Sequence, residues 1–148
     1  MSPTALVVLV VAGPLLGRWL ADRRRLTWTL FALSLMPVAA LTFVPVDREV
    51  FARCTFQWAL PTPGRVELMA NLVLFVAPAL LATVATRRPL VVLLGAVVGS
   101  AAIEALQAAV TALGRSCDST DWSSNAIGAA IGVLLGVAAL RLARPARR

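Results

Sequence analysis

The sequence predicts an all-α fold: a polytopic transmembrane helix bundle with about five spans, forming a single domain over residues 1–148. Three observations lead to this fold class. Of the 148 residues, 59% are hydrophobic and only 14% are charged, whereas a soluble domain carries about a quarter charged residues. The mean hydropathy of +0.85 is typical of a chain embedded mostly in lipid. Apolar runs also alternate with short polar segments in which the arginines gather.

The apolar runs define the predicted spans, since a helix needs about 20 apolar residues to cross a bilayer. The first run is short and contains Pro14, so we expect a bent, slightly under-length helix. The second has Trp28 at its basic end, where tryptophan anchors a helix at the interface. In chain order, the predicted spans lie near residues 5–21, 26–46, 66–86, 90–111 and 124–141.

The predicted loop over residues 47–65 mixes charged with aromatic side chains. This combination is typical of helices that lie in the plane of the membrane interface. A short interfacial helix is therefore a candidate for the part of the loop up to Leu60. The turn residues 61–64 (PTPG) are expected to end it.

The arginines set the expected orientation, because the side of a membrane protein richer in positive charge stays in the cytoplasm. One side of a five-span bundle would hold Arg18, Arg23, Arg24, Arg25, Arg87, Arg88, Arg141, Arg144, Arg147 and Arg148, and the other only Arg48, Arg53, Arg65 and Arg115. We therefore expect the N-terminus outside and the C-terminus in the cytoplasm. The cluster at residues 23–25 follows the first span, which indicates a retained helix and not a cleaved signal peptide. The net charge of +7 then reflects topology and attraction to anionic lipid, so nucleic acid is not an expected partner.

The two cysteines, Cys54 and Cys117, fall in loops on the same expected outer face. Because that compartment is oxidising, we predict a disulfide that closes a loop of about sixty residues, with two unpaired thiols as the alternative. The pair has neither CxxC nor zinc spacing. The sequence contains no histidine, which excludes a Ser-His-Asp triad, an imidazole metal site and a histidine phosphatase.

One face of the last predicted helix carries a polar stripe that continues as glycines. Its members recur at steps of three and four: Asp118, Asp121, Asn125, Gly128, Gly132 and Gly136. Small residues at this spacing let membrane helices approach closely. Gly128 and Gly132 are therefore expected to serve helix packing, as are Phe75 and Pro78 of the third span.

Three polar pairs come from three different spans, all in the outer half of the membrane. Each pair has helical spacing and shares one face: Glu67 with Asn71, Glu104 with Gln107, and Asp121 with Asn125. Because lipid cannot satisfy such groups, we expect them to meet in an outward-facing polar pocket between the third, fourth and fifth spans. The predicted ligand-binding residues are Glu67, Asn71, Glu104, Gln107, Arg115, Asp118, Asp121 and Asn125.

Glu104 is the deepest of these groups, roughly 10 Å below the loop at 1.5 Å per residue. It must be protonated, paired with Arg115, or wetted by a cavity. Arg115 is most simply a salt-bridge partner for Glu104, Asp118 or Asp121. Asp118 and Asp121 also have a purely structural interpretation, in which they cap the last helix at the positive end of its dipole.

Three segments of the chain resemble the VanZ-like family of small bacterial membrane proteins. Residues 71–78 (NLVLFVAP) are similar to the family's N-x-x-L-F element, residues 100–107 (SAAIEALQ) to S-x-x-x-E-x-x-Q, and residues 115–128 to R-x-x-D-x-x-D-x-x-x-N-x-x-G. Just after the position of Pro78 the family often has a glycine, where this chain has Ala79 and Leu80. The resemblance implies a multi-pass protein of the bacterial plasma membrane and cell envelope. It also implies a connection with antibiotic resistance, since a founding member is associated with resistance to teicoplanin.

Three functional hypotheses follow. In the first, the pocket binds or handles an amphipath of the outer leaflet: a lipid headgroup, a lipid-linked cell-wall intermediate or a lipoglycopeptide such as teicoplanin. In the second, the protein is an intramembrane hydrolase or transferase in which Glu104 and Asp118 or Asp121 act as acid and base, with or without a divalent cation. No other cofactor is expected. In the third, the protein is a structural accessory subunit of a membrane complex. The sequence leaves open whether a reaction is catalysed, and it leaves the oligomeric state open too.

Overall fold

The computed structural model describes residues 3–47 and 52–143 of the chain. Within these residues the α-helices are α1 (Pro3–Leu20), α2 (Arg24–Phe43), α3 (Val66–Thr86), α4 (Pro89–Ala109) and α5 (Ser119–Ala143). The other described elements are the short 3-10 helix η1 (Thr111–Leu113) and the two-residue strands β1 (Cys54–Thr55) and β2 (Cys117–Asp118). The predicted all-α class is confirmed.

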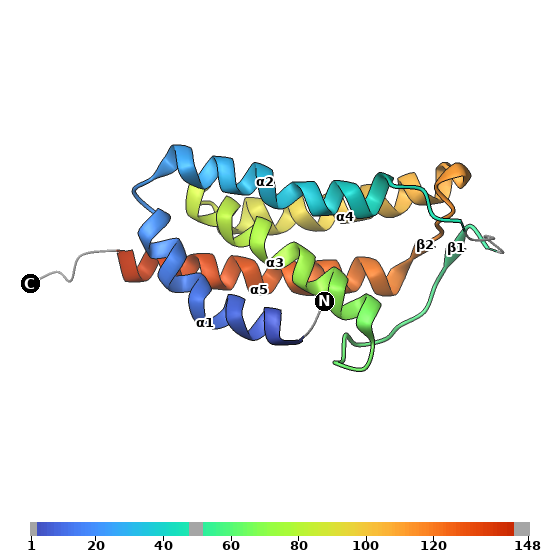
Figure 1. Ribbon diagram of the computed structural model, residues 1–148, viewed down its shortest axis with the longest axis horizontal. Coiled ribbons are helices and arrows are strands. Elements are labelled where there is room, and N and C mark those ends of the chain that lie inside the picture. Colours follow the sequence, from blue (N-terminus) through green and yellow to red (C-terminus); the bar gives the residue numbers. More distant parts are fainter. Residues whose placement is uncertain (1–2, 48–51, 144–148) are drawn as a thin grey trace, which may run out of the picture.

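Successive helices run in opposite directions, so their connections gather at two ends of the bundle (Figure 1). We call the end with β1 and β2 the disulfide end, and the end with the α1–α2 and α3–α4 connections the arginine end. The described arginines at the arginine end are Arg18, Arg23, Arg24, Arg25, Arg87, Arg88 and Arg141, whereas those at the disulfide end are Arg53, Arg65 and Arg115. Arg48, Arg144, Arg147 and Arg148 lie outside the described residues.

Among the described helices, α2, α3, α4 and α5 have the length and apolar composition needed to cross a membrane. The apolar stretch Thr4–Leu20 of α1 is shorter, in agreement with an under-length first helix. The outer face of α4 exposes large apolar side chains, among them Leu90, Val91, Leu94 and Val98. Apolar surface of this extent is rare on soluble monomers and is suited to contact with lipid.

α3 is the central helix and packs against each of the other four helices. Thirteen of its residues are buried, whereas α4 buries only Ser100, so the core forms around α3 and α4 lies at the edge. Phe75 and Pro78 are among the buried residues of α3. Phe75 belongs to a cluster with Ala129 and Val133 of α5.

α5 approaches α3 closely along its stripe of glycines. A Cβ atom added at Gly128 would collide with the carbonyl oxygen of Leu72, and one added at Gly132 would collide with that of Val76. A side chain at either position would push the two helices apart, so glycine is required there. This close approach brings the polar start of α5 next to the polar start of α3.

The loop before α3 differs from the prediction. Residues 52–65 form no helix, and residues 48–51 of the predicted interfacial helix lie outside the described residues. Instead β1 pairs in parallel with β2, with Cys54 opposite Cys117. The predicted disulfide joins these cysteines at a Cα–Cα distance of 4.5 Å. Partners distant in sequence therefore hold this segment extended, and they satisfy backbone groups that a helix would satisfy locally.

Helix ends also differ from the predicted bounds. α2 ends at Phe43 instead of residue 46, because Val44 precedes Pro45 and adopts the extended conformation that proline imposes. α5 begins at Ser119 instead of residue 124. Asp118 makes this early start favourable, since its Oδ1 accepts hydrogen bonds from Thr120 N at 2.7 Å and Thr120 Oγ1 at 2.6 Å.

Candidate functional site

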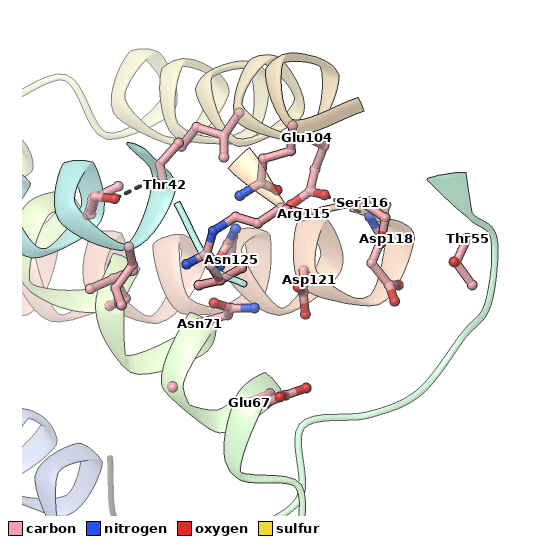
Figure 2. A pocket seen from close by; sticks show the side chains of 18 of the residues that line it. Thr42, Thr55, Glu67, Asn71, Glu104, Arg115, Ser116, Asp118, Asp121 and Asn125 are labelled. Atoms are coloured by element: carbon pink, nitrogen blue, oxygen red, sulfur yellow. Dashed lines mark hydrogen bonds between the residues drawn. The ribbon is translucent and has the colours of Figure 1, made fainter. Parts of the chain in front are cut away.

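A polar cavity of about 640 Å³ lies at the disulfide end of the bundle. Its volume falls within the range of roughly 300–1,000 Å³ that is usual for small-molecule sites. All eight predicted ligand-binding residues line it: Glu67 and Asn71 of α3, Glu104 and Gln107 of α4, Arg115 from the connection, Asp118 of β2, and Asp121 and Asn125 of α5. Figure 2 shows these side chains, apart from Gln107, which is not labelled, coming from separate elements.

The start of α5 is held in place by hydrogen bonds to the loop before α3. Besides capping α5, Asp118 accepts a hydrogen bond at its Oδ2 from Gln57 Nε2 at 2.8 Å. The Ser119 hydroxyl accepts from Gln57 N at 2.9 Å and donates to Gln57 O at 2.6 Å. The disulfide and these bonds together tie the loop before α3 to the start of α5.

Glu104 is held by a backbone donor. Its Oε2 accepts a hydrogen bond from Asp118 N at 2.8 Å. The partner that its depth requires is therefore the backbone of β2. No ion pair joins Arg115 to Glu104, Asp118 or Asp121 in the described part of the chain, which corrects the predicted salt bridge. The reason is directional: Arg115 extends across the cavity towards Asn125 and away from the Glu104–Asp118 contact (Figure 2).

Among the described residues that line the cavity, two have a buried side-chain atom without a hydrogen-bond partner: Arg115 at Nε and Asn125 at Oδ1. The Asn125 residue is only 5% exposed. Its other amide atom, Nδ2, donates to Ser100 Oγ at 2.9 Å, which joins α5 to α4. One buried donor and one buried acceptor thus belong to residues that line the same cavity, and buried groups of this kind normally pair with protein, water or a ligand.

The remaining site residues lie around Arg115 and Asn125. Asn71 and Asp121 face one another across α3 and α5, and Glu67 lies farther out, near the start of α3 (Figure 2). Gln107 lines the cavity from the last turn of α4. The cavity is therefore polar across its width, between helices whose other faces are apolar.

The model of the VanZ/LLP1 family matches residues 5–141 of this sequence. The chain belongs to the VanZ/LLP1 family. The match runs from α1 to the last turns of α5, so it extends beyond the three resembling segments and includes the first two helices. Neither a curated protein nor a solved structure matches the chain.

In this VanZ/LLP1 protein the three segments that carry the sequence resemblance meet at the cavity. Asn71 comes from the α3 segment, Glu104 and Gln107 from the α4 segment, and Arg115 and Asn125 from the segment that enters α5. Spacing within each helix indicated which residues share a face. It could not show that all the faces border one space, because that depends on how the helices pack.

Sequence reasoning missed the contribution of α2. Val38, Leu41 and Thr42 of α2 also line the cavity, as does Val46 just beyond it. A threonine in an apolar helix does not indicate a polar site, because its hydroxyl commonly donates to a carbonyl of the same helix. The Thr42 hydroxyl does so, with Val38 O as acceptor at 2.8 Å. The cavity therefore has four helical walls and not three.

Within the described residues, no group of three or more histidine, cysteine, aspartate or glutamate side chains comes together as a metal site. Glu104 and Asp118 each already accept hydrogen bonds from protein groups. A divalent cation bound here would therefore need oxygen ligands from side-chain amides and backbone carbonyls as well.

Proposed function

We propose that this VanZ/LLP1 protein is a plasma-membrane protein whose polar cavity binds the head of an amphipathic molecule of the outer leaflet. The class includes a lipid headgroup, a lipid-linked cell-wall precursor and a lipoglycopeptide such as teicoplanin. The observation that carries the proposal is that Arg115 and Asn125, which both line one cavity, each have a buried side-chain atom without a hydrogen-bond partner, Nε and Oδ1.

The free-energy cost of unsatisfied polar groups favours a cavity that holds a ligand. Leaving a buried donor or acceptor without a partner costs about 1–3 kcal/mol, and more for a charged group. A polar or charged group within a membrane bundle is normally retained for function, because it is expensive there. A headgroup with phosphate, amine or hydroxyl groups supplies the missing partners, and its apolar tail stays in the surrounding lipid.

Two features support placing the cavity at the outer surface. The disulfide between Cys54 and Cys117 lies at the same end as the cavity, and disulfides persist in oxidising compartments outside the cytoplasm. Most described arginines lie at the opposite end, which favours the cytoplasm for that end. The hydrogen bonds that Glu104 and Asp118 accept are accounted for by their structural roles, without a reaction.

The direct test is to purify the protein from bacterial membranes in mild detergent and to identify co-purified lipids by mass spectrometry. Wild type should retain an amphipath at about one molecule per chain through repeated washing. Arg115→Gln should lose most of it, because glutamine is uncharged and lacks the guanidinium donors. Arg25→Gln is the matched control, since it removes the same charge from the exposed start of α2 at the arginine end.

The proposal fails if wild type retains no amphipath, or if Arg115→Gln retains as much as Arg25→Gln. Equal elution volumes and equal thermal unfolding midpoints for the two variants will show that a loss of lipid does not reflect unfolding. The comparison thus separates binding at the cavity from general attraction of arginine to anionic lipid.

A further inference from the structure

The charge of the cavity favours a particular kind of head. Among the described lining residues, three carboxyl groups near the start of α5 (Glu104, Asp118 and Asp121) share the cavity with a single guanidinium, Arg115. A ligand carrying only negative charge would gain from Arg115 but would be repelled by this excess of acidic groups. A head that carries both a positive and a negative group matches the cavity better.

The two unsatisfied atoms point to the same chemistry. Arg115 Nε is a donor that needs an acceptor, and guanidinium pairs well with phosphate oxygens. Asn125 Oδ1 is an acceptor that needs a donor, and it belongs to a residue only 5% exposed. A primary ammonium supplies three N–H donors, whereas a quaternary ammonium supplies none. A phosphate and a primary ammonium together supply the missing acceptor and donor, and the charge balance of the cavity favours the ammonium over an uncharged hydroxyl donor.

A second cavity offers a place for an acyl chain. It has a volume of about 570 Å³ and lies between α1, α2 and α3, where Ala5, Val8, Pro37, Val73, Leu74 and Ala77 are among its mostly apolar lining residues. We call it the α1–α2–α3 groove. Leu74 lines both this groove and the polar cavity. Pro37 of the groove also directly precedes Val38 of the polar cavity, so the two spaces adjoin.

Along α2 and α3 the polar cavity is followed by the apolar groove, as the polar head of a lipid is followed by its acyl chain. On α3 the polar Asn71 comes first, and Ala77 of the groove lies about 9 Å deeper at 1.5 Å per residue. On α2, which runs the other way, Thr42 of the polar cavity is nearer the disulfide end than Pro37 of the groove. Both helices thus pass from polar to apolar towards the middle of the bundle.

We propose that the protein binds a zwitterionic phospholipid with a primary ammonium head, of the phosphatidylethanolamine type. Its phosphate lies against Arg115, its ammonium lies between Asp121 and Asn125, and one acyl chain occupies the α1–α2–α3 groove. This inference rests on the proposed function and names the class of amphipath. Asp121 is the expected ammonium partner because it lines the cavity opposite Asn71. Asp118, in contrast, already serves as the cap of α5.

The headgroup is tested with delipidated full-length protein in detergent, titrated with phosphatidylethanolamine, phosphatidylcholine and phosphatidylglycerol that carry identical acyl chains. Binding is measured by native mass spectrometry and by the thermal unfolding midpoint, which a ligand of the folded state raises. The affinity of wild type for phosphatidylethanolamine should be about tenfold higher than its affinity for the other two lipids, because one charge-assisted hydrogen bond contributes about this much. Asp121→Asn should abolish this preference, and Arg115→Gln should weaken binding of all three lipids.

The groove is tested with Ala77→Phe, which fills it. This variant should bind long-chain phosphatidylethanolamine about tenfold more weakly, a loss of about 1.4 kcal/mol. Its binding of water-soluble glycerophosphoethanolamine should be unchanged, which shows that the headgroup site is intact. Ala105→Phe is the matched control, since it adds the same ring at an exposed position on α4.

The outcomes separate this inference from the proposed function. Equal binding of phosphatidylethanolamine and phosphatidylglycerol by wild type overturns the ammonium assignment but leaves amphipath binding standing. An unchanged affinity of Ala77→Phe for the long-chain lipid overturns the groove assignment alone. Absence of binding to all three phospholipids, with another amphipath co-purifying, overturns the lipid class; absence of any amphipath overturns the proposed function as well.

Discussion

Asp118 makes several structural hydrogen bonds at the site. Its Oδ1 caps α5 through Thr120, its Oδ2 binds Gln57, and its backbone N–H donates to Glu104. The structural interpretation of Asp118 as a helix cap therefore accounts for its contacts. It also sets the position of α5, and with it the position of Asp121 and Asn125 in the cavity wall.

Replacing Asp118 with alanine should destabilise the protein by about 0.5–2 kcal/mol, the usual effect of losing a helix cap. Asp118→Asn should lose much less, because its side-chain oxygen still accepts from Thr120. The measurement is the thermal unfolding midpoint in detergent for both variants beside wild type. Equal destabilisation by alanine and asparagine would show that charge, and not capping, is what Asp118 contributes.

At the residue scale, the sequence was informative about which side chains need a partner but not about which partner they have. The depth of Glu104 in an apolar helix predicted a partner, and one exists. That partner is a backbone N–H of β2 and not Arg115. The conformation of the segment between α4 and α5 decides this, and such a segment has no periodic pattern from which it can be predicted.

At the scale of elements, the contact between α3 and α5 depends on small residues. Gly128 lies against the backbone of Leu72, so an added methyl group has no space there. Gly95 and Gly99 of α4, in contrast, have nothing within 4 Å of an added Cβ. The same residue type therefore has different roles on the two helices.

This contrast gives a matched prediction. Gly128→Ala should destabilise the protein by about 1–3 kcal/mol, because the methyl group overpacks the α3–α5 contact. Gly95→Ala should stabilise it by about 0.5–1 kcal/mol, since alanine favours a helix over glycine and meets no neighbour. Unfolding of each variant in mixed micelles measures both values. A neutral Gly128→Ala would mean that α3 and α5 do not pack as closely as described.

The elements could be predicted to different extents for a physical reason. The five helices follow from long apolar runs, and lipid enforces helix in such runs because it offers no other hydrogen-bond partners. The loop over residues 52–65 is outside those runs, and its shape is set by β2 and by the disulfide. The interfacial helix that the sequence left open does not form over residues 52–60, because local composition says nothing about such distant partners.

At the scale of the whole molecule, the disulfide fastens the loop before α3 to the start of α5 across a sequence separation of 63 residues. Its loss should lower the free energy of unfolding by about 2–4 kcal/mol, mainly because the unfolded chain becomes less restricted. The measurement compares thermal unfolding of wild type with and without reductant, beside a Cys54→Ser, Cys117→Ser double variant. A midpoint that does not move on reduction would contradict this role.

The orientation of the bundle is a separate whole-molecule prediction. With most arginines in the cytoplasm, the C-terminus should face inward and the disulfide end outward. A green fluorescent protein fused to the C-terminus should fluoresce, and alkaline phosphatase fused there should be inactive. The reverse pattern would place the cavity at the cytoplasmic surface and would remove the outer-leaflet part of the proposed function.

The central claim is that polar groups from α3, α4 and α5 enclose a site for the head of an amphipath. An experimental structure of the protein in lipid nanodiscs containing phosphatidylethanolamine tests this most directly. We expect density for a headgroup within hydrogen-bonding distance of Arg115 and Asn125, with Glu104 turned towards the cavity. Glu104 facing the acyl chains, or a closed bundle in which Arg115 and Asn125 satisfy each other, would contradict the claim.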